Sequence, residues 1–136
     1  MPAHSKEFPW PSHYGRYGYF AQRMEAHSSI ASVIEISEPV YELTLGNGKQ
    51  LRVFICECYS YGIAEYIETI ETLGRFDVII INSVWCSYTN KAKRMARDQK
   101  VGLFDIAEFM AALNTDNIWS YLDEDTQKIF KENGWL

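Results

Sequence analysis

Polar and aromatic side chains gather at the carboxyl ends of two predicted strands of this chain, or directly after them. The first group is Glu57, Tyr59, Ser60 and Tyr61, and the second is Asn82, Ser83, Trp85 and Tyr88. Ligands of open α/β sheets bind beyond the carboxyl ends of parallel strands. Rings among polar groups are typical of a small-molecule pocket or a protein-binding hot spot. The ligand-binding candidates are Tyr59, Tyr61, Trp85 and Tyr88, and the competing interpretation is that these rings close the end of the core.

A basic run follows this second group. Five of the 13 Lys and Arg residues lie within positions 90–100, namely Lys91, Lys93, Arg94, Arg97 and Lys100. Lys91, Arg94 and Arg97 are candidates for phosphate contacts. A solvated helix face is the favoured interpretation, because basic side chains near a helix C-terminus also suit the helix dipole.

The cysteines and histidines do not form a pattern typical of a metal or nucleophile site. Cys56 and Cys58 lie two apart on a predicted strand and share a face, but Cys86 leaves the total odd. A zinc site needs about four ligands, and no second Cys/His pair has a matching spacing. We therefore expect reduced, buried thiols and no resident cofactor.

Length, composition and net charge restrict the classes of protein to which this chain can belong. A chain of 136 residues with 47% hydrophobic residues suits one domain over 1–136, and no apolar run approaches the roughly 20 residues that span a bilayer. The N-terminus lacks a signal-peptide pattern, so we expect a cytoplasmic protein without membrane contacts. The net charge of -5 disfavours general nucleic-acid binding.

Periodicity predicts an α/β core in the order α-β-β-β-α-β over 17–113. Its first elements are an irregular arm over 1–12, a helix over Tyr17–His27, and strands over Ser32–Ile36, Val40–Leu45 and Leu51–Tyr59. Asn47-Gly48 tolerate positive φ and predict a two-residue hairpin loop. With that loop, Glu38 lies opposite Glu57, and Glu42 lies opposite Val53.

The second half continues this pattern. Isoleucines at helical spacing predict a helix over 63–73 that Gly74 ends, and a buried strand over Asp77–Asn82 runs parallel to its predecessor. The remaining predicted elements are a Thr89-capped helix over Asn90–Gln99, a short strand or extended link over Val101–Phe104, a helix containing Ile106 and Leu113, and two short helices in 115–136.

This order, followed by the pattern Thr89-x-x-Ala92-x-x-x-Ala96, resembles the restriction-endonuclease-like superfamily, also called PD-(D/E)xK. The segment 79–114 looks like the C-terminal part of its type IV restriction branch. The resemblance covers roughly 17–113 and implies a mixed sheet, with the helices of 115–136 as additions. It also implies metal-dependent phosphodiester hydrolysis.

In that family, an acidic residue on the second strand and a Glu or Gln on the third hold Mg²⁺ or Mn²⁺. A Lys two residues later, on the same face, supports the attacking water. The resemblance makes Glu57 the third-strand acid and Glu38 or Glu42 its partner. The Lys position, however, is Tyr59.

Two interpretations of this departure compete. In the first, which we favour, the chemistry is lost and the domain binds a partner protein or a small ligand. In the second, the chain is a divalent-metal nuclease whose base or cation comes from elsewhere, such as Glu25 or Arg23 on the first helix. Arg52 points to the other face, and Lys49 lies at the hairpin end. A third hypothesis is a small-molecule binder without nuclease ancestry.

The N-terminal aromatic residues suggest one further contact. They are Phe8, Trp10, Tyr14, Tyr17, Tyr19 and Phe20. These rings could stack bases, but we favour packing onto the sheet or onto a second subunit, which makes a homodimer built on this arm a hypothesis.

Overall fold

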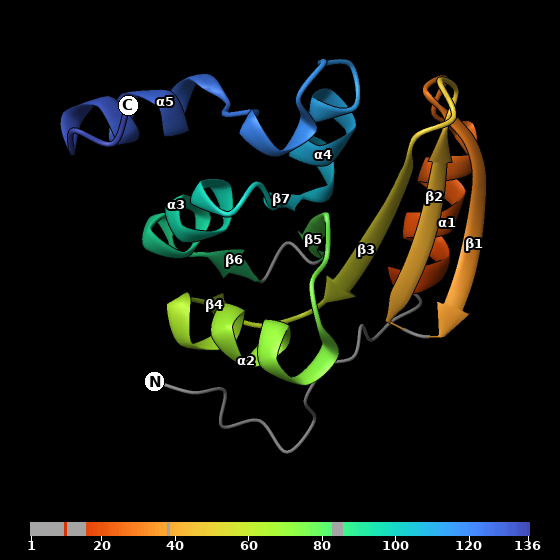
Figure 1. Cartoon of the computed structure of the whole chain (residues 1–136), viewed down its shortest axis with the longest axis horizontal. Helices are drawn as coiled ribbons and strands as arrows, with labels where there is room; N and C mark the ends of the chain where they lie inside the picture. Colours follow the sequence, from red (N-terminus) through yellow and green to blue (C-terminus); the bar gives the residue numbers. More distant parts are fainter. Residues whose placement is uncertain (1–9, 11–15, 38, 83–85) are drawn as a thin grey trace.

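The centre of the fold is a five-stranded mixed sheet in the order β1-β2-β3-β5-β7 (Figure 1). The computed structural model describes residues 10, 16–37, 39–82 and 86–136. The strands are β1 Ile30–Ser37, β2 Val40–Leu45, β3 Gln50–Cys56, β5 Val78–Ile81 and β7 Gly102–Asp105. The first three are antiparallel neighbours, and β5 and β7 run parallel to β3. The α/β class predicted from the sequence is confirmed.

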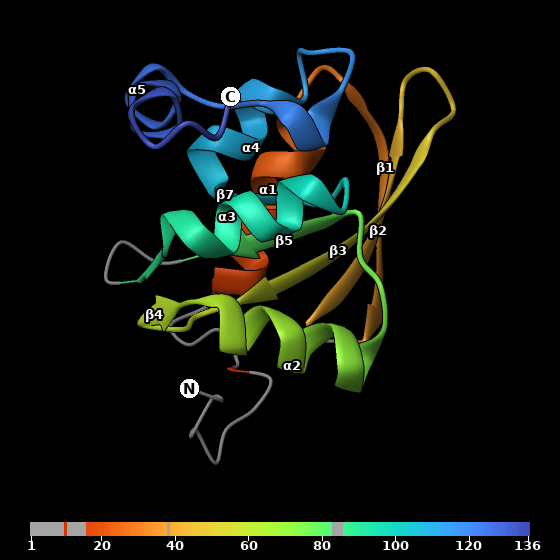
Figure 2. The same ribbon diagram turned by 60° about the vertical axis from the view of Figure 1, so that its left-hand side comes forward.

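Helices cover both faces of this sheet. They are α1 Arg16–Ala26, α2 Ile63–Leu73, α3 Asn90–Asp98, α4 Ile106–Ala112, the 3₁₀ helix η1 Ile118–Ser120 and α5 Glu124–Glu132. Figure 2 shows α2 and α3 side by side in front of the sheet. A two-stranded parallel sheet joins β4 Ser60–Tyr61 to β6 Ser87–Tyr88, directly before these two helices. No helix of the described ranges is long and apolar enough to cross a membrane.

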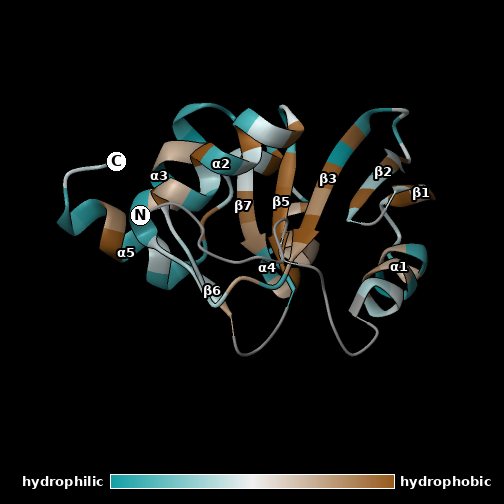
Figure 3. Cartoon of the chain, turned by 90° about the horizontal axis from the view of Figure 1, so that it is seen from below, coloured by the Kyte–Doolittle hydropathy of each residue, from teal (hydrophilic) through white to brown (hydrophobic). Residues whose placement is uncertain are grey.

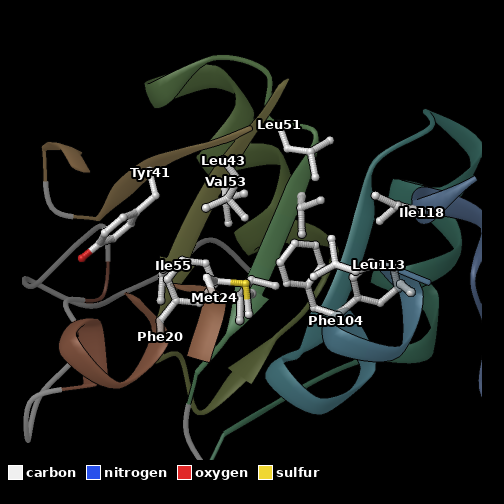
Figure 4. Packing of buried hydrophobic residues seen from close by; sticks show 14 of the residues in the cluster. Phe20, Met24, Tyr41, Leu43, Leu51, Val53, Ile55, Phe104, Leu113 and Ile118 are labelled. Carbon is white, nitrogen blue, oxygen red and sulfur yellow. The ribbon is translucent and has the colours of Figure 1, made fainter. Parts of the chain in front are cut away.

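Strand alternation divides the core into two layers. Leu51, Val53 and Ile55 of β3 pack with α1 and α4, where Phe20 and Phe104 join them (Figure 4). Phe54 and Cys56 of the same strand point to the opposite face and pack under α2 and α3. Figure 3 shows α2 and α3 on one side of the sheet and α1 on the other.

The central strand is shorter than predicted. The sequence predicts a strand to Tyr59, but β3 ends at Cys56. Its parallel neighbour β5 pairs only with Val53–Cys56, and the backbone N–H of Asn82 donates to the Cys56 carbonyl where that pairing stops. The chain then leaves the main sheet and pairs again as β4.

The predicted register of β2 and β3 is wrong by one residue. Glu42 faces Arg52, not Val53. The backbone N–H of Leu45 donates to the Lys49 carbonyl at 2.8 Å, so the loop has three residues, and Gly48 alone takes a positive φ, of 88°. A two-residue turn would need positive φ at Asn47 as well.

Candidate functional site

The two described candidate carboxylates do not meet. Glu42 lies in β2 opposite Arg52, whereas Glu57 follows the end of β3. Because Glu42 lies opposite Arg52, its distance from Glu57 along the sheet corresponds to five residue steps of β3 and the chain after it. Five steps of extended chain measure about 16 Å. Glu38 lies outside the described residues. In the described ranges, no three His, Cys, Asp or Glu side chains gather in a way that could hold a metal ion.

The position where the resemblance implies an amine is an exposed ring. Tyr59 lies beyond the strand and is 81% exposed. Arg52 is engaged at the end of α2, where its guanidinium donates to the carbonyls of Arg75 at 2.7 Å and Leu73 at 3.2 Å. On α1, the Arg23 guanidinium lies 3.7 Å from the sulfur of Met110.

The described aromatic candidates have separate environments. Tyr61 is fully buried, its hydroxyl lies 2.7 Å from the Thr69 hydroxyl, and its ring meets Trp10 edge to face at 5.7 Å. Tyr88 is half-buried, and its hydroxyl contacts Glu108 in the ionic cluster described below. Trp85 lies outside the described residues. Tyr61 is therefore a core residue, and Tyr59 is the exposed candidate among the described rings.

Part of the N-terminal aromatic group packs within the chain. Trp10 is buried against Tyr61, and Tyr17 and Phe20 contact Tyr41. Tyr19 is 38% exposed. Phe8 and Tyr14 lie outside the described residues, so the dimer hypothesis keeps Tyr19 as its described exposed ring.

A buried ionic cluster joins α3, β6 and α4. The Lys93 ammonium donates to the Leu103 carbonyl at 2.6 Å, to the Tyr88 hydroxyl at 3.2 Å and to Glu108 Oε2 at 3.2 Å. The Tyr88 hydroxyl donates to the Glu108 carboxylate at 2.8 Å. The side chains of Lys93 and Glu108 are only 2% and 8% exposed. All three N–H donors of Lys93 therefore have acceptors.

The electrostatics of this cluster point to a structural role. Burial lowers the pKa of Lys93, and the Glu108 carboxylate opposes that shift. Burial raises the pKa of Tyr88, and the negative charge of Glu108 adds to the effect. The carboxylates that influence Lys93 are those of Glu108, Asp123 and Asp105. Lys93 is thus committed to its own cluster and does not replace the missing amine beside Glu57.

Sequence reasoning missed Lys93 and Glu108. A helical stripe of Thr89, Ala92, Lys93 and Ala96 would have placed Lys93 on the inward face. The spacing Asp105-x-x-Glu108 is that of a capping box, and both of its hydrogen bonds are present at the start of α4. These two signals would have identified the buried lysine and the position of the glutamate.

Two open depressions adjoin along α2 and α3. One has a volume of about 430 Å³ and is lined by Ser60, Gly62, Ile63, Ala64, Glu65, Thr89 and Lys91. The other measures about 350 Å³ and is lined by Ile63, Lys91, Arg94, Met95, Asp98, Gln99 and Trp135. They share Ile63 and Lys91, and we call them together the α2/α3 groove.

Two of the three phosphate-contact candidates line this groove, and the third contacts a backbone carbonyl. Lys91 and Arg94 are exposed and line the groove, and the Arg94 guanidinium lies 4.9 Å from the centre of the Trp135 ring. Arg97 turns away and donates to the Ser120 carbonyl at 3.3 Å. The basic run is therefore not one solvated face, since it includes the buried Lys93 as well.

Two of the three thiols are unsuited to act as nucleophiles. Cys56 and Cys58 are buried, Cys86 is half-buried, and none of the three forms a disulfide within the described residues. Burial raises the pKa of Cys58 to about 11 and that of Cys56 well above its ordinary value. Both therefore stay protonated near neutral pH, and the thiolate is the reactive form.

No family model, curated protein or solved structure matches this chain. Function must therefore be argued from the site. In its described part, the site combines an exposed ring at Tyr59, a neighbouring groove with two cations, and an ionic cluster that is closed to solvent. Among the described residues, this arrangement offers an exposed ring and a groove, and it does not bring Glu42 and Glu57 together.

Proposed function

We propose that this chain is a restriction-endonuclease-like domain that has lost its nuclease chemistry and acts as a protein-binding module. The observation that carries the proposal is the exposed Tyr59 ring at the position of the implied catalytic Lys. The observed order α1-β1-β2-β3-β4-α2-β5, in which β4 lies outside the main sheet, supports the fold assignment. So does the helix α3, in which the Thr89 side chain accepts a hydrogen bond from the backbone N–H of Ala92.

Several contacts support the loss of chemistry. Hydrolysis of this kind needs hard oxygen ligands around one cation and a positive charge near the attacked phosphorus. Glu42 is displaced along the sheet from Glu57, and Arg52 and Lys93 are held by other partners. Restoring the site would require breaking those contacts.

Binding of a protein explains why Tyr59 is exposed. Tyrosine is enriched at the energetic centres of protein interfaces, where it is desolvated on binding. Ser60, the next residue, lines the α2/α3 groove, so the backbone at position 59 adjoins a concave surface. A partner that covers Tyr59 could therefore continue into this groove.

Site-specific photo-crosslinking tests this proposal. The photoreactive residue p-benzoylphenylalanine is introduced in place of Tyr59 and, as a control, in place of Lys49. Both positions are exposed, but Lys49 directly precedes β3 and Tyr59 follows its end, so they lie at opposite ends of the strand. We expect a discrete protein adduct from position 59 and none from position 49. Equal labelling at both positions, or none at 59, would contradict the proposal.

A further inference from the structure

The strand β1 forms an open edge of the main sheet. It is the last strand in the order β1-β2-β3-β5-β7, and among the described residues it pairs with β2 alone. Figure 3 shows β1 at the end of the sheet, with α1 on one of its faces. An edge strand presents backbone N–H and C=O groups that can pair with one more strand. The chemistry of this edge therefore specifies an extended segment as its partner.

The opposite edge of the sheet is covered. The backbone N–H of Gly102 in β7 donates to the Asp77 carbonyl, directly before β5, so the groups of the next residue, Leu103, point outward. The Lys93 ammonium donates to that Leu103 carbonyl at 2.6 Å, and η1 packs against the same strand. In the described part of the chain, β1 is therefore the accessible edge of the main sheet.

Two residues in the middle of β1 direct their backbone groups away from β2. Along a strand these groups alternate between its two neighbours. The N–H of Leu45 donates to the carbonyl directly before β3, so alternation turns the groups of Glu42 towards β1. Glu42 is opposite Ile34, whose groups therefore point to β2, and those of Val33 and Glu35 point outward. Among the described residues, no hydrogen bond outside the β1–β2 pairing occupies these outward groups.

The side chains of β1 favour pairing. Val33 packs with the α1 layer of the core, so alternation turns Ile34 to the other face, where it is 49% exposed. Glu35 is the single charged residue of the strand, and its carboxylate accepts the Tyr41 hydroxyl at 3.3 Å on the α1 side. Edges that resist pairing carry lysines, prolines or several charges. The edge of β1 instead carries β-branched apolar residues, which suit a sheet.

A second copy of β1 matches this edge in an antiparallel arrangement. Register shifts flank Ser32–Glu35, so this regular stretch sets the pairing. With a two-fold axis at Ile34, Val33 of each copy faces Glu35 of the other, and the two pairs exchange about four hydrogen bonds. The two Ile34 side chains then form a non-hydrogen-bonded pair, in which opposite side chains lie closest.

Neighbouring registers are less favourable. An axis at Glu35 would place the two carboxylates directly opposite each other, and like charges in that position destabilise a sheet. An axis at Val33 would pair Glu35 with Ala31, which lies in the irregular part of the strand. The arrangement about Ile34 avoids both problems.

We propose that two copies of this chain associate through their β1 edges about a two-fold axis at Ile34. The five strands of each copy join into one continuous sheet. Because the β7 edge is covered, the association closes at two copies and does not continue into a fibre. The proposal uses neither Tyr59 nor the α2/α3 groove, so it does not rest on the proposed function.

Cysteine crosslinking tests the position of the axis. Ile34→Cys and Ile36→Cys are each made in a chain that carries Cys86→Ser, because the other two thiols are buried. Opposed non-hydrogen-bonded residues have Cα atoms about 4.5 Å apart, within disulfide range. The two copies of position 36 would be four residue steps apart, or about 13 Å.

With glutathione disulfide as the oxidant, Ile34→Cys should form a covalent dimer at least tenfold faster than Ile36→Cys. Random collision predicts the opposite order, because Ile36 is 58% exposed and Ile34 49%. Equal rates, or a faster reaction at position 36, would overturn the proposed axis.

A charge at the axis provides the second test. Ile34→Lys places two ammonium groups opposite each other, and Ile67→Lys on α2, where Ile67 is 41% exposed, is the matched control. In sedimentation equilibrium, the mass of the wild-type chain and of the control should rise towards that of a dimer between about 10 µM and about 1 mM. Ile34→Lys should stay monomeric.

The outcomes separate the possible occupants of the edge. A wild-type monomer at the higher concentration, an equal rise for Ile34→Lys, or a mass that grows beyond the dimer would overturn the proposal. A monomer that still crosslinks another protein through position 59 would refute the β1 dimer and leave the proposed function intact.

Discussion

Removing one partner of the buried cluster should destabilise the fold strongly. Lys93→Met takes away the three hydrogen bonds of the ammonium and leaves the Glu108 carboxylate, only 8% exposed, without its counter-ion. Breaking a buried pair on one side costs about 3–5 kcal/mol. Domains of this size are stable by about 5–15 kcal/mol, so the loss is a large fraction of the total.

Urea unfolding followed by tryptophan fluorescence measures this loss, and the chain contains four Trp residues. Lys91→Met on the same helix is the control, because Lys91 is exposed and should change stability by less than about 0.5 kcal/mol. The double variant Lys93→Met/Glu108→Gln removes both charges and should cost at least about 2 kcal/mol less than the sum of its single changes. A cost below about 1 kcal/mol for Lys93→Met, or strict additivity, would refute the reasoning.

Three further changes test the packing and the ionisation states. Gly102→Ala places a Cβ against the Phe104 ring and should cost about 1–3 kcal/mol in urea unfolding. Arg52→Met removes two hydrogen bonds at the end of α2 and should cost about 1–2 kcal/mol, seen as a lower urea midpoint. Cys58 keeps its proton in the fold, with a pKa of about 11 against 9.0. Its stabilising effect is therefore complete below pH 9 and is lost as pH rises to 11, by up to about 3 kcal/mol. Cys58→Ala should reduce this alkaline loss in unfolding measured at each pH; an unchanged pH dependence would contradict that assignment.

Local patterns predicted most elements well. The helix 63–73 and its end at Gly74 follow from isoleucine spacing and a glycine, and α2 has those bounds. The Thr89 cap was also predicted, because a hydroxyl before a helical stripe has one local function there. Such features depend on neighbours within one helical turn, so the sequence contains the necessary information.

The errors arose where distant residues decide the outcome. The segment Gly46-Asn47-Gly48 is compatible with a loop of two or of three residues. The observed three-residue loop shifts the register by one residue, so that Glu42 faces Arg52 rather than Val53. The end of β3 depends on the length of β5, which is not encoded in the strand itself.

The ionic cluster shows the same limitation at the candidate site. Lys93 belongs to a basic run that is typical of a solvated helix face. The local stripe places it on the inward side of the helix, but its ion-pair partner is Glu108, fifteen residues away, which the helix itself does not specify. Tyr59 and Tyr61 are alike in sequence, yet one is 81% exposed and the other 0%. The point at which the chain leaves the sheet decides between them.

A cleavage assay tests the central claim, that the Glu57 site no longer performs hydrolysis, most directly. Labelled single- and double-stranded DNA and RNA are incubated with the purified chain and with Glu57→Ala, each with Mg²⁺ and with Mn²⁺. We predict that product formation by the wild-type chain equals that of the variant under every condition. Metal-dependent cleavage by the wild-type chain that Glu57→Ala abolishes would contradict the account.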